Sequence, residues 1–182
     1  MLSESMAEAL NKQINCEMYS SNLYLQMSCW CASKGLEGAA AFLDEHADEE
    51  RMHMRKILTY VSEKGNLAIV GEVDSPATQF KSIKDVFEQT FEHEQLVTRK
   101  VNNLVHLATQ EQDYATLQFL QWYVSEQHQE EVLFKTILDK IEMIGIEGQG
   151  IFFIDQEIER LITQKEQAAK AMSMPEAETG AA

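Results

Sequence analysis

Six residues that could bind a metal or move a proton occur in this sequence as two sets of three with the same spacing. The first set is Glu17, Glu50 and His53, and the second is Glu94, Gln127 and Glu130. In each set the residues are separated by 33 and then 3 positions, and the second set begins 77 residues after the first. Helical residues three apart project from one face. Each set therefore predicts a carboxylate on one helix facing a pair of side chains on the next, with all six donors at one centre.

Each of these residues also has an ordinary structural explanation when taken singly. Glu17 could be a solvated helix residue, His53 a core histidine, and 49–50 part of a charged face. The repeated spacing favours the functional interpretation, because solvated faces have no reason to repeat it. Buried carboxylates are costly unless a cation compensates them. Imidazole with carboxylates and no thiolate is typical of an iron or manganese pair rather than structural zinc.

Four long helical segments are predicted to position these side chains. In the first, apolar residues recur at steps of three and four, as at Leu10, Ile14 and Met18. Ser82 followed by Asp85 resembles a capping box, and Asp113 is a second helix N-cap. The predicted helices cover about 5–33, 36–64, 82–109 and 113–145, with a short fifth helix from 151 to about 164.

The segment 66–81 separates the second and third helices. It contains Gly71 and Pro76 and has no helical pattern. Because it is long for a turn between antiparallel helices, we expect it to cross the bundle lengthwise. The predicted fold is thus all-α, a four-helix bundle with a long crossover and a short fifth helix. One domain spans 1–165, and the Ala/Glu-rich tail 166–182 is predicted to be disordered.

The composition limits the partners and the compartment. With 15 Lys+Arg against 30 Asp+Glu the formal charge is −15, so we expect neither nucleic-acid nor membrane partners, and cations suit the chain better. Taken alone, the acidity is explained by solubility. Three cysteines without a C-x-x-C pair indicate a reducing compartment. The start has no signal-peptide pattern and no long apolar run follows, so a cytoplasmic protein is expected.

The two sets of donors resemble those of the ferritin-like di-iron carboxylate proteins, in which two helices give Glu and two give a Glu-x-x-His couple. Longer stretches at 37–43, 49–54 and 119–127 resemble bacterial non-haem ferritin, and the resemblance covers about 1–165. It implies a ferroxidase that oxidises Fe²⁺ with O₂ or peroxide at a di-iron centre. It also implies a homo-oligomeric shell of 24 subunits that stores the iron as a ferric mineral.

The resemblance also implies a role for each residue of the centre. One iron would be held by Glu17, Glu50 and His53, and a second by Glu50, Glu94 and Glu130, with Glu50 bridging. Tyr24 would border the pair, and Gln127 stands where haem-containing bacterioferritins have a second bridging glutamate. Trp122 is predicted to belong to the core.

A third iron site and a haem are two further features of related families. Glu49, Glu126 and Glu130 match a third site, but Gln129 stands where a glutamate is usual, and losing that charge should weaken a hard-cation site. Bacterioferritins bind haem through a methionine directly after the bridging glutamate. Arg51 occupies that position, and Met52 is turned 100° away, so no haem is expected.

Three other classes of protein were weighed against non-haem ferritin. A bacterioferritin is disfavoured by the ligand positions. Another di-iron oxidase or peroxidase without a storage role remains an alternative, although a rubrerythrin-like peroxidase would need a four-cysteine electron-transfer segment that a chain with three cysteines does not have. A purely structural bundle does not explain the repeated spacing.

Overall fold

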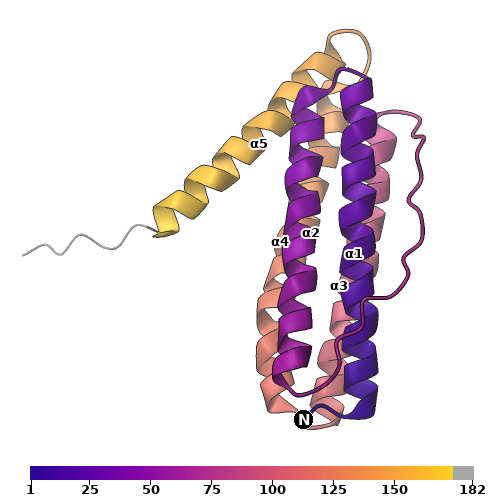
Figure 1. Ribbon diagram of the computed structural model, residues 1–182. Coiled ribbons are helices and arrows are strands. Elements are labelled where there is room, and N and C mark those ends of the chain that lie inside the picture. The colour runs from indigo at the N-terminus through magenta and orange to yellow at the C-terminus, as the bar shows by residue number, and fades with distance from the viewer. Residues whose placement is uncertain (174–182) are drawn as a thin grey trace, which may run out of the picture.

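Four long helices lie side by side in the computed structural model, and a fifth leaves one end of the bundle at an angle (Figure 1). The structure describes the backbone of 1–173 and the side chains of 1–163. The helices are α1 (Glu4–Ser33), α2 (Glu37–Glu63), α3 (Ile83–Gln110), α4 (Tyr114–Ile144) and α5 (Gly150–Ser173). No strand occurs in this described part, which confirms the predicted all-α class.

Three of the long helices begin at a side-chain cap. Ser3 and Asp113 accept hydrogen bonds from the backbone N–H of the third residue after them, at 3.0 Å in each case. Ser82 accepts from Asp85 N at 3.2 Å, and the Asp85 carboxylate accepts from Lys81 N at 2.8 Å. The predicted capping box is therefore present with its return bond shifted one residue earlier. These bonds satisfy N–H groups that a helix start leaves unpaired.

The start of α2 is capped by another helix. Leu36 offers no side-chain cap there, and the Asp155 carboxylate of α5 accepts from Gly38 N at 3.1 Å and from Ala39 N at 2.8 Å. A β carbon at Gly38 would lie 2.3 Å from the Asp155 carbonyl oxygen. Glycine is therefore required where α5 packs on α2.

The segment 67–80 crosses the bundle lengthwise, as predicted (Figure 1). Two amides of α1 hold its first part. Asn11 donates to Leu67 O at 3.2 Å and accepts from Ile69 N at 2.8 Å. Asn15 donates to Ile69 O at 3.1 Å and accepts from Gly71 N at 2.6 Å. Because of this crossover, α1–α2 and α3–α4 are two antiparallel pairs, and α2 and α3 run in the same direction.

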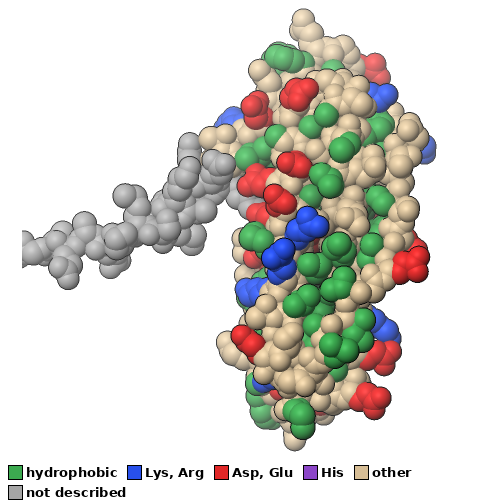
Figure 2. Space-filling model, in the orientation of Figure 1, with side chains coloured by type: hydrophobic (Ala, Val, Ile, Leu, Met, Phe, Trp, Pro, Cys, Tyr) green, Lys and Arg blue, Asp and Glu red, His purple; other side chains and the backbone are tan. Residues whose placement is uncertain are grey.

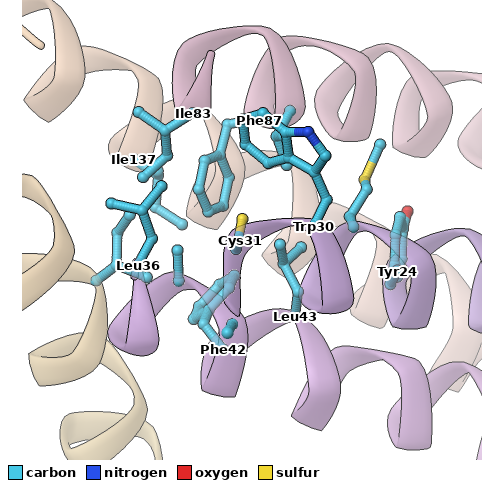
Figure 3. Close-up of a cluster of buried hydrophobic side chains, with 14 of the residues drawn as sticks. Tyr24, Trp30, Cys31, Leu36, Phe42, Leu43, Ile83, Phe87 and Ile137 are labelled. Atoms are coloured by element: carbon cyan, nitrogen blue, oxygen red, sulfur yellow. The ribbon is translucent and has the colours of Figure 1, made fainter. Parts of the chain in front are cut away.

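The hydrophobic core is divided into two clusters along the bundle axis. One lies toward α5 and includes Trp30, Phe42, Phe87 and Ile137 (Figure 3). The other lies toward the chain start and includes Leu2 and buried residues 6–16 of α1, 54–61 of α2, 97–108 of α3 and 120–123 of α4. Between them the four helices contribute a layer of buried polar side chains instead of apolar ones. This polar layer is where the candidate site lies.

One predicted boundary is wrong. The fifth helix continues to Ser173 rather than ending near 164, so it runs past the predicted domain boundary at 165. The segment 166–173 is rich in Ala, Glu, Gln and Lys, which are strong helix formers. The remainder of the predicted tail, 174–182, lies outside the described residues. Among the described helices, none has the length and apolar character needed to cross a membrane.

Candidate metal centre

The polar layer consists of the six residues that the repeated spacing brings together. All are buried, and none is more than 7% exposed: Glu17 and Glu50, His53, Glu94, Gln127 and Glu130. They come from the middle turns of α1, α2, α3 and α4, which lie at one level because the helices have similar lengths. Four carboxylates at one level of a core require protons or a cation to compensate their charge.

One half of the layer forms a compact donor group. Glu17, Glu50 and His53 each present a ligand atom within 4.8 Å of the other two. Three buried atoms here make no hydrogen bond with the described residues: Glu17 Oε2, Glu50 Oε2 and His53 Nδ1. A buried polar atom without a partner costs about 1–3 kcal/mol. These atoms fit a cation between them, and the predicted ligands of the first iron are brought together.

The second half of the layer is arranged differently. Both carboxylate oxygens of Glu94 are occupied by neutral donors: the Tyr24 hydroxyl donates to Oε1, and Gln127 Nε2 donates to Oε2 at 2.9 Å. Among the described residues, Glu94 is in neither of the two donor groups whose ligand atoms lie within 4.8 Å of one another. The charges of Glu50, Glu94 and Glu130 act on one another. Each Glu94 oxygen accepts one hydrogen bond and keeps a second lone pair, so this carboxylate could bind an ion while Tyr24 and Gln127 hold it.

Glu130 lies in a second donor group with a residue that the sequence reasoning missed. His46, Glu49 and Glu130 each offer a ligand atom within 4.8 Å of the others. His46 Nε2 is 3.5 Å from Glu130 and 3.7 Å from Glu49. The signal for His46 was its position three residues before Glu49 and four before Glu50, which places it on the same helical face.

The other predicted residues of the third site do not join this group. Glu126 is half-buried and stands outside it. Gln129 is exposed, and its amide donates to Ser125 Oγ at 3.4 Å, one turn earlier on α4. Gln129 is thus engaged along its own helix rather than pointing into the donor group.

Burial raises the pKa values of two carboxyls of this layer and of the neighbouring Tyr24. The pKa of Glu50 lies well above its usual range because the carboxyl is desolvated and because Glu17 and Glu94 are close. The pKa of Glu94 is raised to about 7, first by burial and then by the charge of Glu130. Burial also raises the pKa of Tyr24 well above 10. Carboxyls that hold protons at neutral pH release them when a cation binds.

Two aromatic rings of α4 border the first donor group. The rings of Trp122 and Tyr123 are stacked at 4.7 Å, and they lie 5.3 Å and 5.8 Å from the ring of His53. Trp122, predicted as a core residue, is half-buried and packs against the core cluster near the chain start. Together the two rings exclude water from one side of His53.

Fold and site together define a four-helix bundle with a buried carboxylate and imidazole centre, and comparisons with known proteins agree. The Ferritin-like domain family matches residues 7–144. A probable bacterial non-heme ferritin-like protein of Haemophilus influenzae is 52% identical over 164 residues, which cover 90% of this chain and 99% of that one. The bacterial non-heme ferritin of Escherichia coli O157:H7 is 51% identical with the same coverage.

Solved structures give the same assignment. The open pore ferritin of Archaeoglobus fulgidus superposes with a TM-score of 0.85 at 41% identity, covering 87% of this chain and 98% of that one. Chlorobium tepidum ferritin superposes with a TM-score of 0.79 at 45% identity, covering 88% and 99%. The chain belongs to the ferritin family, which confirms the predicted family and bundle.

Proposed function

We propose that this chain is an iron-storing ferroxidase. It binds two Fe²⁺ ions in the polar layer of each bundle and oxidises them with O₂ or peroxide. The ferric product is then stored as a mineral inside a hollow shell of 24 subunits. Each Fe²⁺ gives up one electron, so a pair of ions delivers the two electrons that, with two protons, reduce O₂ to hydrogen peroxide or peroxide to water.

The observation that carries this proposal is the donor group of Glu17, Glu50 and His53. Its three inward atoms make no hydrogen bond with the described residues although they are buried between two apolar clusters. A structural core would fill such a layer with apolar or mutually bonded side chains. Hard oxygen donors with one imidazole suit iron and favour the higher charge of Fe³⁺.

The other residues of the polar layer form a second ion position next to the first. Glu94 is the ligand for a second ion, and the Tyr24 hydroxyl and the Gln127 amide hold its carboxylate in place. Glu50, beside both positions, is the bridge. Glu130 completes the second position from the opposite side, where it also faces His46. Protons held by Glu50 and Glu94 leave as the cations enter.

A third ion position would lie between Glu130, His46 and Glu49, with the half-buried Glu126 outside this donor group. The group has two carboxylates and one imidazole within reach of one ion. Gln129 does not add a charge, so this position should bind more weakly than the pair. It would receive iron that leaves the pair on the side of α2 and α4.

Two observations support assembly into a shell. Large hydrophobic side chains are exposed on α1, α2, the crossover and α5, including Leu25, Met52, Leu67 and Phe152, and Figure 2 shows hydrophobic side chains gathered along one face of the bundle. Such faces are typical of subunit contacts. Relatives of 50% identity and more are ferritins over nearly their whole length. The acidic composition would attract Fe²⁺ to the shell.

Stopped-flow absorbance of the metal-free protein mixed with two Fe²⁺ per subunit tests the proposal. Glu50→Ala and the shape-conserving Glu50→Gln should nearly abolish the rapid phase, because both ions lose their shared ligand. Glu63→Ala, an exposed position at the end of the same helix, is the control and should behave as the unmodified chain. Unchanged initial rates in both Glu50 variants would contradict the assigned site. Size-exclusion chromatography separates storage from an oxidase without a shell, since a dominant monomer or dimer contradicts storage.

A further inference from the structure

One buried amide beside the polar layer has no part in the ligand sets described above. Gln13 lies one turn before Glu17 on α1 and is 2% exposed. Its Nε2 donates to Glu17 Oε1 at 2.5 Å and to the Tyr123 hydroxyl at 3.2 Å. Both hydrogens of this amide therefore have acceptors, one on a candidate iron ligand and one on α4.

These bonds make the two oxygens of Glu17 different. Oε1 accepts from Gln13, whereas Oε2 makes no hydrogen bond with any described residue and remains available to an ion. A carboxylate restrained in this way binds a cation through a single oxygen at a fixed angle. An unrestrained carboxylate could rotate and bind through both oxygens.

Tyr123 extends this restraint to a second ligand. Its side chain is fully buried, and its ring lies 5.8 Å from the ring of His53. The hydroxyl bonds to Gln13 while the ring packs against His53. Gln13 thus contacts Glu17 of α1, and Tyr123 contacts His53 of α2. The two side chains together support two of the three residues of the first donor group.

Gln13 also separates Glu17 from a surface cavity. A cavity of about 270 Å³ lies between α1 and α3, and Gln13 lines it together with Ala9, Leu104 and Leu107. The amide is buried at the inner side, where it bonds to Glu17. A shorter side chain at this position would therefore admit water to Glu17, so a test must keep the volume of the side chain.

We propose that Gln13 and Tyr123 are positioning residues that fix Glu17 in single-oxygen coordination and so set the affinity and geometry of the first iron position. This inference rests on the proposed function for the identity of the ion. Hydrogen-bonding partners of metal ligands typically change metal affinity 10- to 100-fold when they are lost. A purely structural amide would change the stability of the metal-free protein and leave the bound ion unaffected.

Cobalt titration of the assembled, metal-free protein tests the inference, because Co²⁺ reports its own coordination in the visible spectrum and is not oxidised in the assay. Gln13→Met removes the amide at similar volume, and Tyr123→Phe removes only the hydroxyl. Leu10→Met, one turn earlier on α1 and fully buried, is the matched control. Calorimetry of the metal-free variants measures their stability separately.

We expect Gln13→Met to weaken binding of the first Co²⁺ by 10- to 100-fold and to change its visible spectrum. Tyr123→Phe should have a smaller effect in the same direction. The double variant should be less than additive because the two groups share a hydrogen bond. With Fe²⁺, the apparent KM of the rapid phase should rise more than kcat falls. Leu10→Met should match the unmodified protein.

Unmodified affinity and spectrum in Gln13→Met would overturn the inference. If that variant does not assemble, Tyr123→Phe carries the test, and a spectrum and affinity equal to those of the unmodified protein overturn the inference equally. Failure of the unmodified protein to bind Co²⁺ at all would contradict the proposed function instead. The two results are therefore distinguishable.

Discussion

Glu94 should make the metal-free protein less stable as the pH rises, and replacing it with glutamine should remove that effect. Its pKa is raised from 4.5 to about 7, mainly by burial. A carboxyl whose pKa is higher in the folded than in the unfolded chain stabilises the fold below the unfolded value. That contribution is lost as the pH rises through the folded value. The window is therefore pH 4.5 to about 7.

The magnitude follows from the difference between the two pKa values. Moving from 4.5 to about 7 corresponds to about 3 kcal/mol per subunit at pH 8. For a chain of this length, about 3 kcal/mol corresponds to roughly 6 to 12 °C in melting temperature. Glu94→Gln keeps the shape, and the Gln127 amide can turn to offer its unbonded Oε1 to the new N–H. The melting temperature of the variant should therefore exceed that of the unmodified protein at pH 8 and differ little from it at pH 4.5.

Calorimetry of both metal-free proteins at several pH values between 4.5 and 8, at one scan rate and concentration, measures the effect. Glu92→Gln, an exposed position on the same helix, is the control. Melting temperatures that stay parallel for the Glu94→Gln and unmodified proteins across this range would refute the reasoning. Adding Zn²⁺ at pH 8 should raise the melting temperature of the unmodified protein more than that of Glu94→Gln, since only the former keeps the charged ligand.

Three further outcomes follow from the contacts described above. Tyr24→Phe removes the hydroxyl bonded to Glu94 and should slow rapid Fe²⁺ oxidation several-fold in stopped-flow measurements without loss of assembly. Gly38→Ala should destabilise the docking of α5, where a β carbon would lie 2.3 Å from a carbonyl oxygen, and lower the shell fraction in size-exclusion chromatography; Gly71→Ala, with its nearest neighbour at 3.5 Å, should not. Gln129→Glu should strengthen a third ion position, measured as anomalous scattering after iron soaks at matched dose, and equal density in both proteins would show that Gln129 is no handicap.

The helices and the crossover could be predicted because their signals are local. Apolar periods, the caps at Ser82 and Asp113, and the break around Gly71 all act within a few residues. The six residues of the polar layer could be predicted because their spacing repeats, and helices of similar length bring repeated positions to one level.

The sequence could not reveal which partner each buried side chain takes. Glu94 is bonded to Tyr24 of α1 and Gln127 of α4, so its partners depend on how three helices pack and not on its neighbours in the chain. His46 became part of a donor group only because α4 brings Glu130 to within 3.5 Å. The roles assigned to all these residues remain predictions.

The residues around the start of α2 also give no indication that Asp155 caps this helix. The two groups are 117 residues apart in the chain, and nothing near Leu36 indicates that its N–H groups need a distant partner. The extent of α5 was missed for a different reason. A tail rich in Ala and Glu fits both disorder and helix, and composition alone does not separate them.

The two asparagines of α1 fix the register of the crossover against that helix. Asn11 and Asn15 are four helical residues apart, about 6 Å along the axis, and the groups they bind on the crossover repeat every two extended residues, about 6.6 Å. The spacing of the asparagines along α1 nearly equals the spacing of these groups along the crossover. Each asparagine amide can therefore bond to one carbonyl and one N–H of the crossover. Inserting a single residue between Asn66 and Ile69 would turn those groups to the wrong side. Insertions or deletions should therefore be tolerated after Gly71, where no amide of the described residues holds the crossover in this way. Before Gly71 they should be tolerated only in steps of two residues.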